Sequence, residues 1–178
     1  MLIEERFQRL TPHRREHIER VTAVMESLAH AHHLDRDEAR LAGFGHDLAR
    51  EMSRLALLDE ARRLGLRLGR EEEQEPVLLH GPVAAAWLEQ AGRGTPSVWE
   101  AIRYHTTGAP HLNALGRALY IADGVEPGRQ YPERQKLLDL ALMDLDAGYC
   151  EVLRHTVVYL KDRGFAPHPD MLSALDGC

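Results

Sequence analysis

Six histidine and aspartate residues between positions 17 and 123 are the side chains of this sequence best able to carry chemistry. They are His17, His46, Asp47, His80, His105 and Asp123. Each falls on the apolar face of an expected helix or at a helix end, where burying an imidazole or a carboxylate is unfavourable unless a partner compensates its polarity. Nitrogen and oxygen ligands without a thiolate suit iron, manganese, magnesium or zinc in an open site. The set therefore predicts a divalent-metal centre, although for any single member a hydrogen-bonded core histidine or a helix-capping aspartate is the alternative.

The helices that must position the first half of this set can be read from apolar spacing. Ile18, Val21 and Met25 recur at helical intervals and predict a long helix over residues 12–32, with His17 on or beside its apolar stripe. Asp35 and Glu38 form a capping pair for the next helix, whose last residues are small and lead to His46. Small residues allow a neighbouring helix to come close, so we expect His46 to be buried at a helix–helix contact.

The second half of the set follows the same logic. Ser53 is expected to cap a helix over residues 54–64, and Ser97 with Glu100 a helix that ends at His105. A further helix delivers Asp123, and two more cover residues 133–145 and 147–163. No segment shows sustained strand alternation. The sequence therefore predicts an all-α fold, a single domain over residues 1–178 with a core over about 14–163 and a C-terminal tail over 164–178.

Composition narrows the classes of protein and partner. The chain has 178 residues, of which 44% are hydrophobic and 28% charged, as in an ordinary soluble domain. Its formal net charge of −6, without a compensating basic stripe, argues against a nucleic-acid polymer as partner. No signal peptide or membrane span is expected. The two cysteines, Cys150 and Cys178, form no CxxC motif and predict no disulfide framework, which fits a reduced cytoplasmic location.

The order His…His-Asp…Asp resembles the HD-domain superfamily of metal-dependent phosphohydrolases, and signatures of serine hydrolases, P-loops and dinucleotide folds are missing. More closely, the chain resembles the YqeK family of symmetrical bis(5′-nucleosyl)-tetraphosphatases over residues 14–170. The motifs that carry this resemblance are Arg14-x-x-His17, His46-Asp47-Leu48-Ala49, Leu78-Leu79-His80-Gly81, Ala101-Ile102-x-x-His105-Thr106-Thr107-Gly108 and Ala122-Asp123-x-x-Glu126-Pro127-x-Arg129. One departure is Arg50, because the family usually has lysine at this place after the His-Asp pair.

The resemblance implies an HD-type helical bundle and a role for each matched residue. The metal, most simply iron and either one or two ions, would be bound by His17, His46, Asp47 and Asp123. Asp47, His80 and His105 would be catalytic, and the last two would meet either a second metal or the phosphates. The implied nucleotide contacts are His17, His80, His105, Asp123, Gly124, Arg129, Ala166, Pro167, His168, Pro169, Asp170 and Met171.

The activity implied by the resemblance is hydrolysis of diadenosine tetraphosphate to two ADP by a metal-activated water. The partners would be this dinucleotide and its product ADP, with no nucleic-acid polymer and no membrane; the oligomeric state is open, with a homodimer as one option. Three alternatives stay open: another HD-type phosphohydrolase such as a nucleoside monophosphatase, an iron-dependent oxygenase of the same superfamily, and a nucleotide-binding module with weak turnover.

Overall fold

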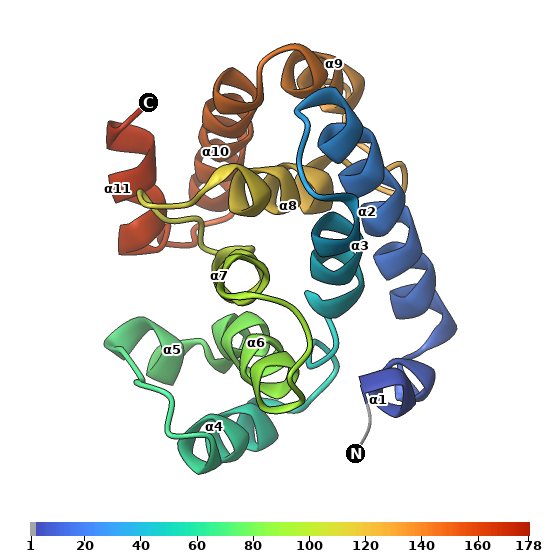
Figure 1. The fold of residues 1–178 in the computed structure, drawn as a ribbon. Helices are drawn as coiled ribbons and strands as arrows, with labels where there is room; N and C mark the ends of the chain where they lie inside the picture. Colours follow the sequence, from blue (N-terminus) through green and yellow to red (C-terminus); the bar gives the residue numbers. More distant parts are fainter. Residues whose placement is uncertain (1–2) are drawn as a thin grey trace.

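The computed structural model describes residues 3–178, and within this range helices are the only regular elements (Figure 1). The prediction of an all-α fold is confirmed. In chain order the elements are α1 (Ile3–Arg9), α2 (Pro12–Ala31), α3 (Arg36–Gly45), α4 (Arg54–Arg63), α5 (Arg70–Gln74), the 3-10 helix η1 (Pro76–Leu79), α6 (His80–Gln90), α7 (Pro96–Tyr104), α8 (Ala114–Val125), α9 (Arg134–Met143), α10 (Leu145–Asp162) and α11 (Pro169–Asp176).

Side-chain caps set several of the helix starts. Asp35 accepts a hydrogen bond from the backbone N–H of Glu38 (2.8 Å) at the start of α3, and Ser53 accepts one from Ala56 (3.2 Å) at the start of α4, as predicted. The prediction that Ser97 caps α7 is wrong. Thr95 accepts the capping bond from Val98 (3.4 Å) instead, because Pro96 has no N–H to satisfy and its fixed φ already suits the first helical position.

Two short helices, α1 and α11, were not expected from the sequence. Each is anchored by apolar residues that reach the core: Ile3 in α1, and Met171 and Ala174 in α11. Helices of this length are marginal in isolation, and packing against the rest of the protein supplies most of their stability. Their periodicity is therefore too short to be recognised without the tertiary structure.

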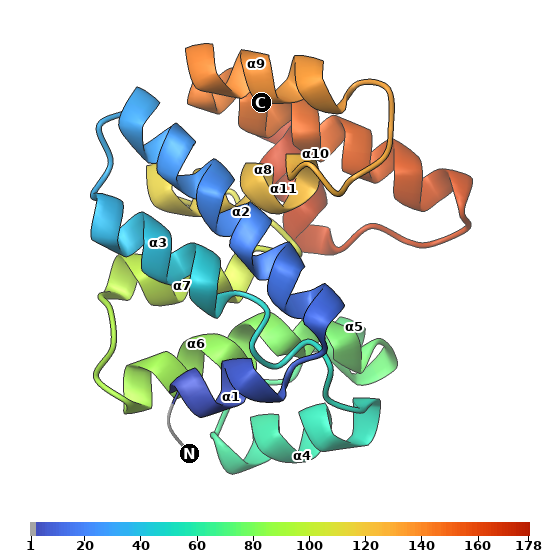
Figure 2. The ribbon, with the colours of Figure 1, turned by 90° about the vertical axis from the view of Figure 1, so that its right-hand side faces the viewer.

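Helix α8 lies at the centre, and the helices around it bring distant parts of the chain together. Eight of its residues are buried, and α2, α7 and α10 all pack against it. Helices α2 and α3 run side by side (Figures 1 and 2), and a Cβ on Gly43 would come within 2.9 Å of the Thr22 Cα. This close approach fixes the end of α3, and with it His46, against the middle of α2.

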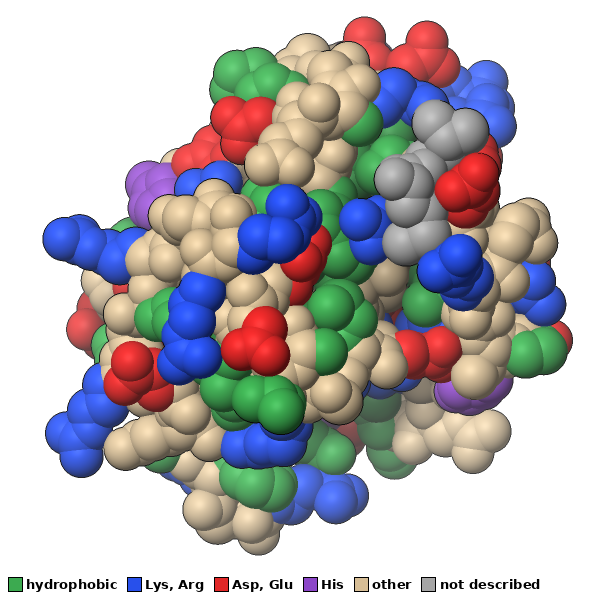
Figure 3. Space-filling view, turned by 90° about the horizontal axis from the view of Figure 1, so that it is seen from below, with side chains coloured by type: hydrophobic (Ala, Val, Ile, Leu, Met, Phe, Trp, Pro, Cys, Tyr) green, Lys and Arg blue, Asp and Glu red, His purple; other side chains and the backbone are tan. Residues whose placement is uncertain are grey.

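The surface is of mixed charge on the face around α1 and α4. Arginines and acidic side chains alternate there with apolar patches and do not gather into a basic stripe (Figure 3). Among the helices described, none combines the length and the hydropathy that a bilayer crossing requires.

The cysteine prediction is wrong in the structure, because Cys150 of α10 and Cys178 form a disulfide with a Cα–Cα distance of 5.6 Å. The two residues are 28 positions apart in the sequence. They meet because the chain turns back after α10 and α11 packs against α10, a contact that no local spacing of cysteines reveals.

Candidate metal centre

The six histidine and aspartate residues singled out from the sequence lie together, although they come from five separate places along the chain. His17 lies in the middle of α2, His46 and Asp47 follow α3, His80 begins α6, His105 follows α7, and Asp123 lies in the last turn of α8. Five of them are buried, with His46 wholly inaccessible, while Asp123 is partly exposed. The cluster thus sits at the convergence of four helix ends on the flank of α2.

One half of the cluster joins His17, His46, Asp47 and Asp123. The Nε2 atom of His17 lies 3.3 Å from Nε2 of His46, 3.5 Å from Oδ2 of Asp47 and 3.2 Å from Oδ1 of Asp123. The His46 Nε2 atom is 3.7 Å from the same Asp47 Oδ2. Two imidazole nitrogens and two carboxylate oxygens therefore face one small volume.

The other half of the cluster uses the second oxygen of Asp47. Oδ1 of Asp47 lies 3.1 Å from Nε2 of His80 and 3.8 Å from Nε2 of His105, and these two nitrogens are 3.0 Å apart. The hydroxyl of Thr106 adds a polar atom 3.3 Å from His80 and 3.2 Å from His105. Asp47 is thus shared between two histidine pairs, one on each of its oxygens.

The outer ring nitrogens fix the tautomers of all four histidines. Nδ1 of His46 donates to the carbonyl of Gly43 (2.7 Å), that of His105 to Ile102 (2.7 Å), and that of His80 to Val77. Each carbonyl is three residues back, at a helix end or turn where such groups need a donor. Nδ1 of His17 faces the Glu126 carboxylate at 3.2 Å. A neutral imidazole that donates from Nδ1 keeps a lone pair on Nε2.

While all four imidazoles are neutral, the inward-facing atoms of the cluster are therefore all acceptors. Nitrogen lone pairs 3.0–3.3 Å apart repel each other unless a proton or a cation lies between them. A set of neutral imidazoles and carboxylates is also the donor set of non-haem iron, manganese and zinc sites. The His/Asp cluster is thus compatible with a divalent metal ion.

Burial and charge shift the protonation of these groups strongly. Burial disfavours a charged His17, but hydrogen bonds to Asp123 and Glu126 outweigh it and raise the pKa of His17 to about 9. The pKa of His46 falls to about 4, chiefly through burial. Against the opposing effect of burial, the surrounding imidazoles hold the pKa of Asp47 well below its usual range. In the absence of a metal the cluster thus keeps a proton on His17, which a metal ion would have to displace.

Two residues that support the cluster were quoted in the motifs but given no role. Glu126 is 2% exposed and accepts from His17, Arg20 and the N–H of Gly128. These donors overcome burial and lower the pKa of Glu126 to about 2. Arg14 donates to Oδ2 of Asp47 at 2.6 Å. Arg50, the departure from the family pattern, is half-buried in the turn after Asp47, whose carbonyl accepts its backbone N–H (3.0 Å).

A cavity of about 430 Å³ opens from the cluster. His105, Asp123, Gly124 and Arg129 line its inner part. The Arg129 guanidinium donates to the Asp123 carboxylate at 2.6 Å and to the Asp123 carbonyl at 2.9 Å. Of the nucleotide contacts implied by the resemblance, these four share the cavity.

Aromatic side chains that the sequence did not single out form the outer part of this cavity. Tyr131 stacks on His155 with ring centroids 4.5 Å apart, and the guanidinium of Arg163 lies 4.5 Å from the ring of Tyr159. The Tyr131 hydroxyl donates to the Gly124 carbonyl (2.9 Å), which ties this wall to the end of α8. His155 lies on α10, far from the motifs in sequence, so no local pattern marked it.

Of the remaining implied contacts, His17 and His80 belong to the histidine cluster and residues 166–171 to the tail, and none of them lines the cavity. His168 accepts the N–H of Asp170 at 3.1 Å and thereby caps α11, and its Nε2 lies 3.5 Å from Glu72 of α5. Met171 is 3% exposed and points into the core. In this structure the tail lies beyond the cavity, attached to it through Arg163.

Comparison with known proteins places this geometry in a family. The HD domain family matches residues 14–147. Proteins named symmetrical bis(5′-nucleosyl)-tetraphosphatase from Halalkalibacterium halodurans and Bacillus subtilis are 32% and 30% identical to the chain; each match covers 92% of this chain and 88% of the relative. A crystal structure of a predicted HD superfamily hydrolase involved in NAD metabolism from Clostridium acetobutylicum superposes with a TM-score of 0.92 at 28% identity, covering 98% of this chain and 94% of the other.

Proposed function

The chain belongs to the HD-domain family and, within it, to the YqeK-like symmetrical bis(5′-nucleosyl)-tetraphosphatases, and from this premise we propose how its residues perform that reaction. It is a metal-dependent hydrolase of phosphoric anhydrides that cleaves diadenosine tetraphosphate symmetrically to two ADP. The mechanism rests on one observation. Each carboxylate oxygen of Asp47 faces a different pair of histidines, and Arg129 lines the cavity beside them.

We assign the metal-binding role to His17, His46, Asp47 and Asp123, whose inward atoms are all acceptors while the imidazoles are neutral. Bound there, a divalent ion supplies a water with a pKa lowered toward about 7 and positive charge on the phosphoryl oxygens. We propose iron as the resident metal. Manganese, magnesium and zinc accept the same donor set, so availability also influences the occupant.

His80 and His105 serve the phosphates in this proposal. Both are held by backbone carbonyls and both face Oδ1 of Asp47, so they either bind a second ion or, when protonated, offset charge that develops on the phosphoryl oxygens. Burial works against charge on both. At His105 the attraction of the Asp47 carboxylate outweighs the effect of burial, and the pKa of His105 is raised. At His80 the effect of burial is larger, and the pKa of His80 is lowered.

The cavity accommodates one nucleotide half of the substrate in this proposal. Its volume of about 430 Å³ is near the lower end of the ~300–1,000 Å³ range of small-molecule pockets, too little for a whole dinucleotide. Arg129 has the planar fork that suits a phosphate, and Tyr131, His155 and Tyr159 offer ring faces to a base. Asp123 and Gly124 line the cavity, His17 lies 3.2 Å from Asp123, and residues 166–171 would close over the outer end.

The remaining proposals concern the protein as a whole. We propose one HD domain over residues 1–178, with a core over about 14–163 and the tail over 164–178, at work in the cytoplasm on a small-molecule dinucleotide. The relatives' names and the donor set support this substrate class, while nothing here specifically favours a monophosphatase or a binding module.

The decisive experiment combines metal analysis of anaerobically purified protein with product identification from diadenosine tetraphosphate. Two ADP per substrate, with nucleoside monophosphates inert and activity proportional to bound iron, is the expected result. ATP and AMP as products, or full activity in metal-free protein, would contradict it.

A further inference from the structure

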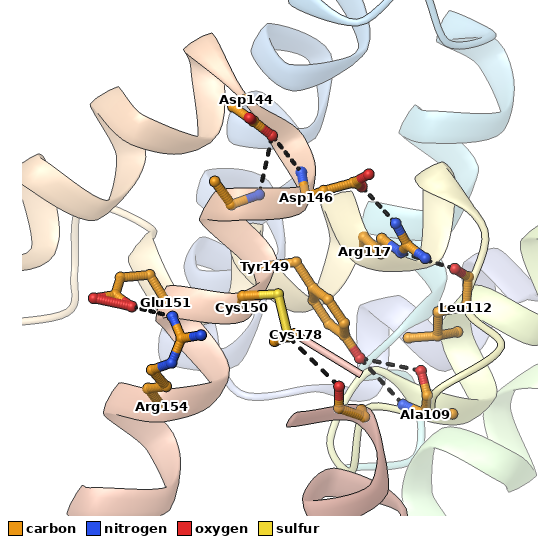
Figure 4. The surroundings of a disulfide bond; sticks show 12 residues. Ala109, Leu112, Arg117, Asp144, Asp146, Tyr149, Cys150, Glu151, Arg154 and Cys178 are labelled. Carbon is orange, nitrogen blue, oxygen red and sulfur yellow. Dashed lines mark hydrogen bonds and ion pairs between the residues drawn. A yellow bond between two sulfur atoms is a disulfide. The ribbon is translucent and has the colours of Figure 1, made fainter. Parts of the chain in front are cut away.

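The disulfide between Cys150 and Cys178 is accessible from outside the protein. Cys150 is half-buried on α10, and Cys178 is exposed. Both cysteines line a surface cavity of about 630 Å³, together with Tyr149, Arg154 and Ala174. Figure 4 shows the bond between Cys150 of α10 and Cys178. A small thiol or disulfide can therefore reach this bond without unfolding the protein.

The segment closed by this bond contains the whole tail. It runs from Cys150 through His155, Tyr159 and Arg163, which line the substrate cavity, and then through residues 164–168 and α11. Figure 2 shows the chain leaving the end of α10 as an extended loop before it turns back into α11. Residues 164–166 are exposed. The disulfide therefore holds the C-terminal end of a segment whose N-terminal part, on α10, forms a wall of the cavity.

Few other contacts hold α11 in place. Met171 and Ala174 are buried, and His168 lies 3.5 Å from Glu72. A helix of eight residues is marginal in isolation, and the ends of chains fray unless they are tied down. The covalent bond at the last residue is thus a main constraint on how often α11 leaves its position.

The same turn of α10 also holds the segment that follows His105. Tyr149, next to Cys150, accepts the N–H of Ala109 at 3.2 Å and donates to its carbonyl at 3.3 Å (Figure 4). Gly108, with φ of +65°, lies so close that a Cβ there would be 2.9 Å from the Tyr149 hydroxyl. Tyr149 does not depend on the disulfide, so the metal centre keeps its anchor when the bond is broken.

We propose that Cys150 and Cys178 form a reversible thiol–disulfide site that sets how tightly the tail closes over the nucleotide. When the bond is formed, α11 stays packed on α10, and residues 164–168 stay tethered at the Arg163 end of the cavity, from where they close over a bound substrate. When it is reduced, the tail opens and substrate binding weakens, while the metal centre is unchanged. The substrate part of this inference rests on the function proposed above.

The oxidant in this proposal is a low-molecular-weight disulfide. One cysteine thiolate attacks the small disulfide, forms a mixed disulfide with half of it and releases the other half as a small thiolate. The second cysteine thiolate then attacks the protein sulfur of this mixed disulfide and releases the second small thiolate. Overall, the protein dithiol and one small disulfide give the protein disulfide and two small thiols. Reduction by two thiols is the reverse of this exchange.

The test compares oxidised and reduced wild-type protein with the double variant Cys150→Ser/Cys178→Ser. Thiol titration after exposure to a small disulfide measures bond formation, and tryptic cleavage after Arg163, in the absence of substrate and added metal, measures tail opening. KM and kcat for diadenosine tetraphosphate measure the effect on the reaction. The double variant is the matched control, because any effect of the reductant on the metal centre occurs in it too.

We expect the two thiols of the wild type to disappear on oxidation. Relative to the oxidised wild type, the reduced protein and the double variant should both be cleaved about tenfold faster after Arg163 and should both have a KM about tenfold higher. This factor corresponds to a tail that is closed about one tenth of the time once the bond is absent. The value of kcat should not change. Equal cleavage rates and equal KM in the two redox states would overturn the proposal, and so would thiols that stay free. If the oxidised protein does not hydrolyse the dinucleotide at all, the proposed function fails, while thiol titration and cleavage still decide whether the disulfide restrains the tail.

Discussion

The metal centre and the C-terminal tail differ in how the fold holds them. Each ligand histidine of the centre is buried and has its outer nitrogen bonded to a fixed acceptor, whether a carbonyl or Glu126. The tail is exposed over residues 164–166. It is held by Met171, Ala174 and Leu175 of α11, by one long imidazole–carboxylate contact and by a disulfide. The centre is thus preorganised, whereas the tail is held by few contacts, which is what the proposed opening and closing over a substrate requires.

This contrast predicts that changes in the centre alter metal retention, changes in the cavity wall alter only nucleotide affinity, and changes in the distant scaffold alter neither.

Asp47→Ala should have the largest effect. Asp47 alone faces both histidine pairs, so its removal leaves the four Nε2 atoms without the shared carboxylate. We expect loss of bound metal and of turnover down to background, measured by metal analysis and ADP release. His46→Ala should behave in the same way. Full activity in a metal-free variant would contradict the assigned roles.

Glu126→Gln comes next. We expect a metal affinity roughly 10–100-fold lower, because the carboxylate that orients His17 and strengthens it as a ligand is replaced by a neutral amide. Metal titration followed by spectroscopy or calorimetry measures this without any turnover assay. The charge partner Arg20 offers a control, since Arg20→Gln removes a contact of Glu126 but leaves the carboxylate on His17. An unchanged metal affinity in Glu126→Gln would show that His17 needs no such support.

Arg129→Ala tests the cavity wall. Loss of a charge-assisted contact to phosphate is worth about 1.5–3 kcal/mol, so ADP binding should weaken by roughly 10–100-fold. Bound metal should stay at the wild-type level, because Arg129 contacts one proposed ligand, Oδ1 of Asp123, and the other three proposed ligands keep their partners. Calorimetry with ADP and metal analysis of the same sample measure the two effects. Equal loss of metal would move Arg129 into the centre and remove the distinction between the two regions.

Glu60 provides the scaffold comparison and the smallest effect. Glu60 accepts hydrogen bonds from Arg63 and from the Trp87 indole. The bond from Arg63 contributes most, and together these bonds lower the pKa of Glu60 from an ordinary value of 4.5 to about 2. A depressed pKa means that the carboxylate stabilises the fold above pH 4.5 and that this contribution is lost as the pH falls toward 2.

The variant Glu60→Gln should therefore have a lower Tm than the wild type near neutral pH, and the difference should shrink on acidification. Thermal unfolding across this pH range measures it, with metal content as the second readout. A Tm difference that does not depend on pH would mean that the Glu60 charge is not what stabilises α4 against α6. A change in metal content would contradict the separation of scaffold and centre.

Much of the fold followed from short-range patterns. The long helix that carries His17 and the caps at Asp35 and Ser53 were predicted from neighbours within a few residues, and the structure has them. The capping role of Thr95 was missed because Ser97 offered an equally good local pattern. Thr95 is favoured by Pro96, which suits the first helical position, and by its hydrogen bond to Glu38 of α3 (2.7 Å).

The sequence by itself determined the longer helices, the set of candidate ligands and the family, because each depends on residue types at fixed short spacings. Only the tertiary structure decided how Asp47 divides between two histidine pairs, that Glu126 lies against His17 across 109 positions, that Tyr131 stacks on His155, and that Cys150 meets Cys178. These contacts join different helices, and their register is set by close packing such as that of Gly43 on Thr22. Such packing depends on the whole set of buried surfaces at once, which no local spacing encodes.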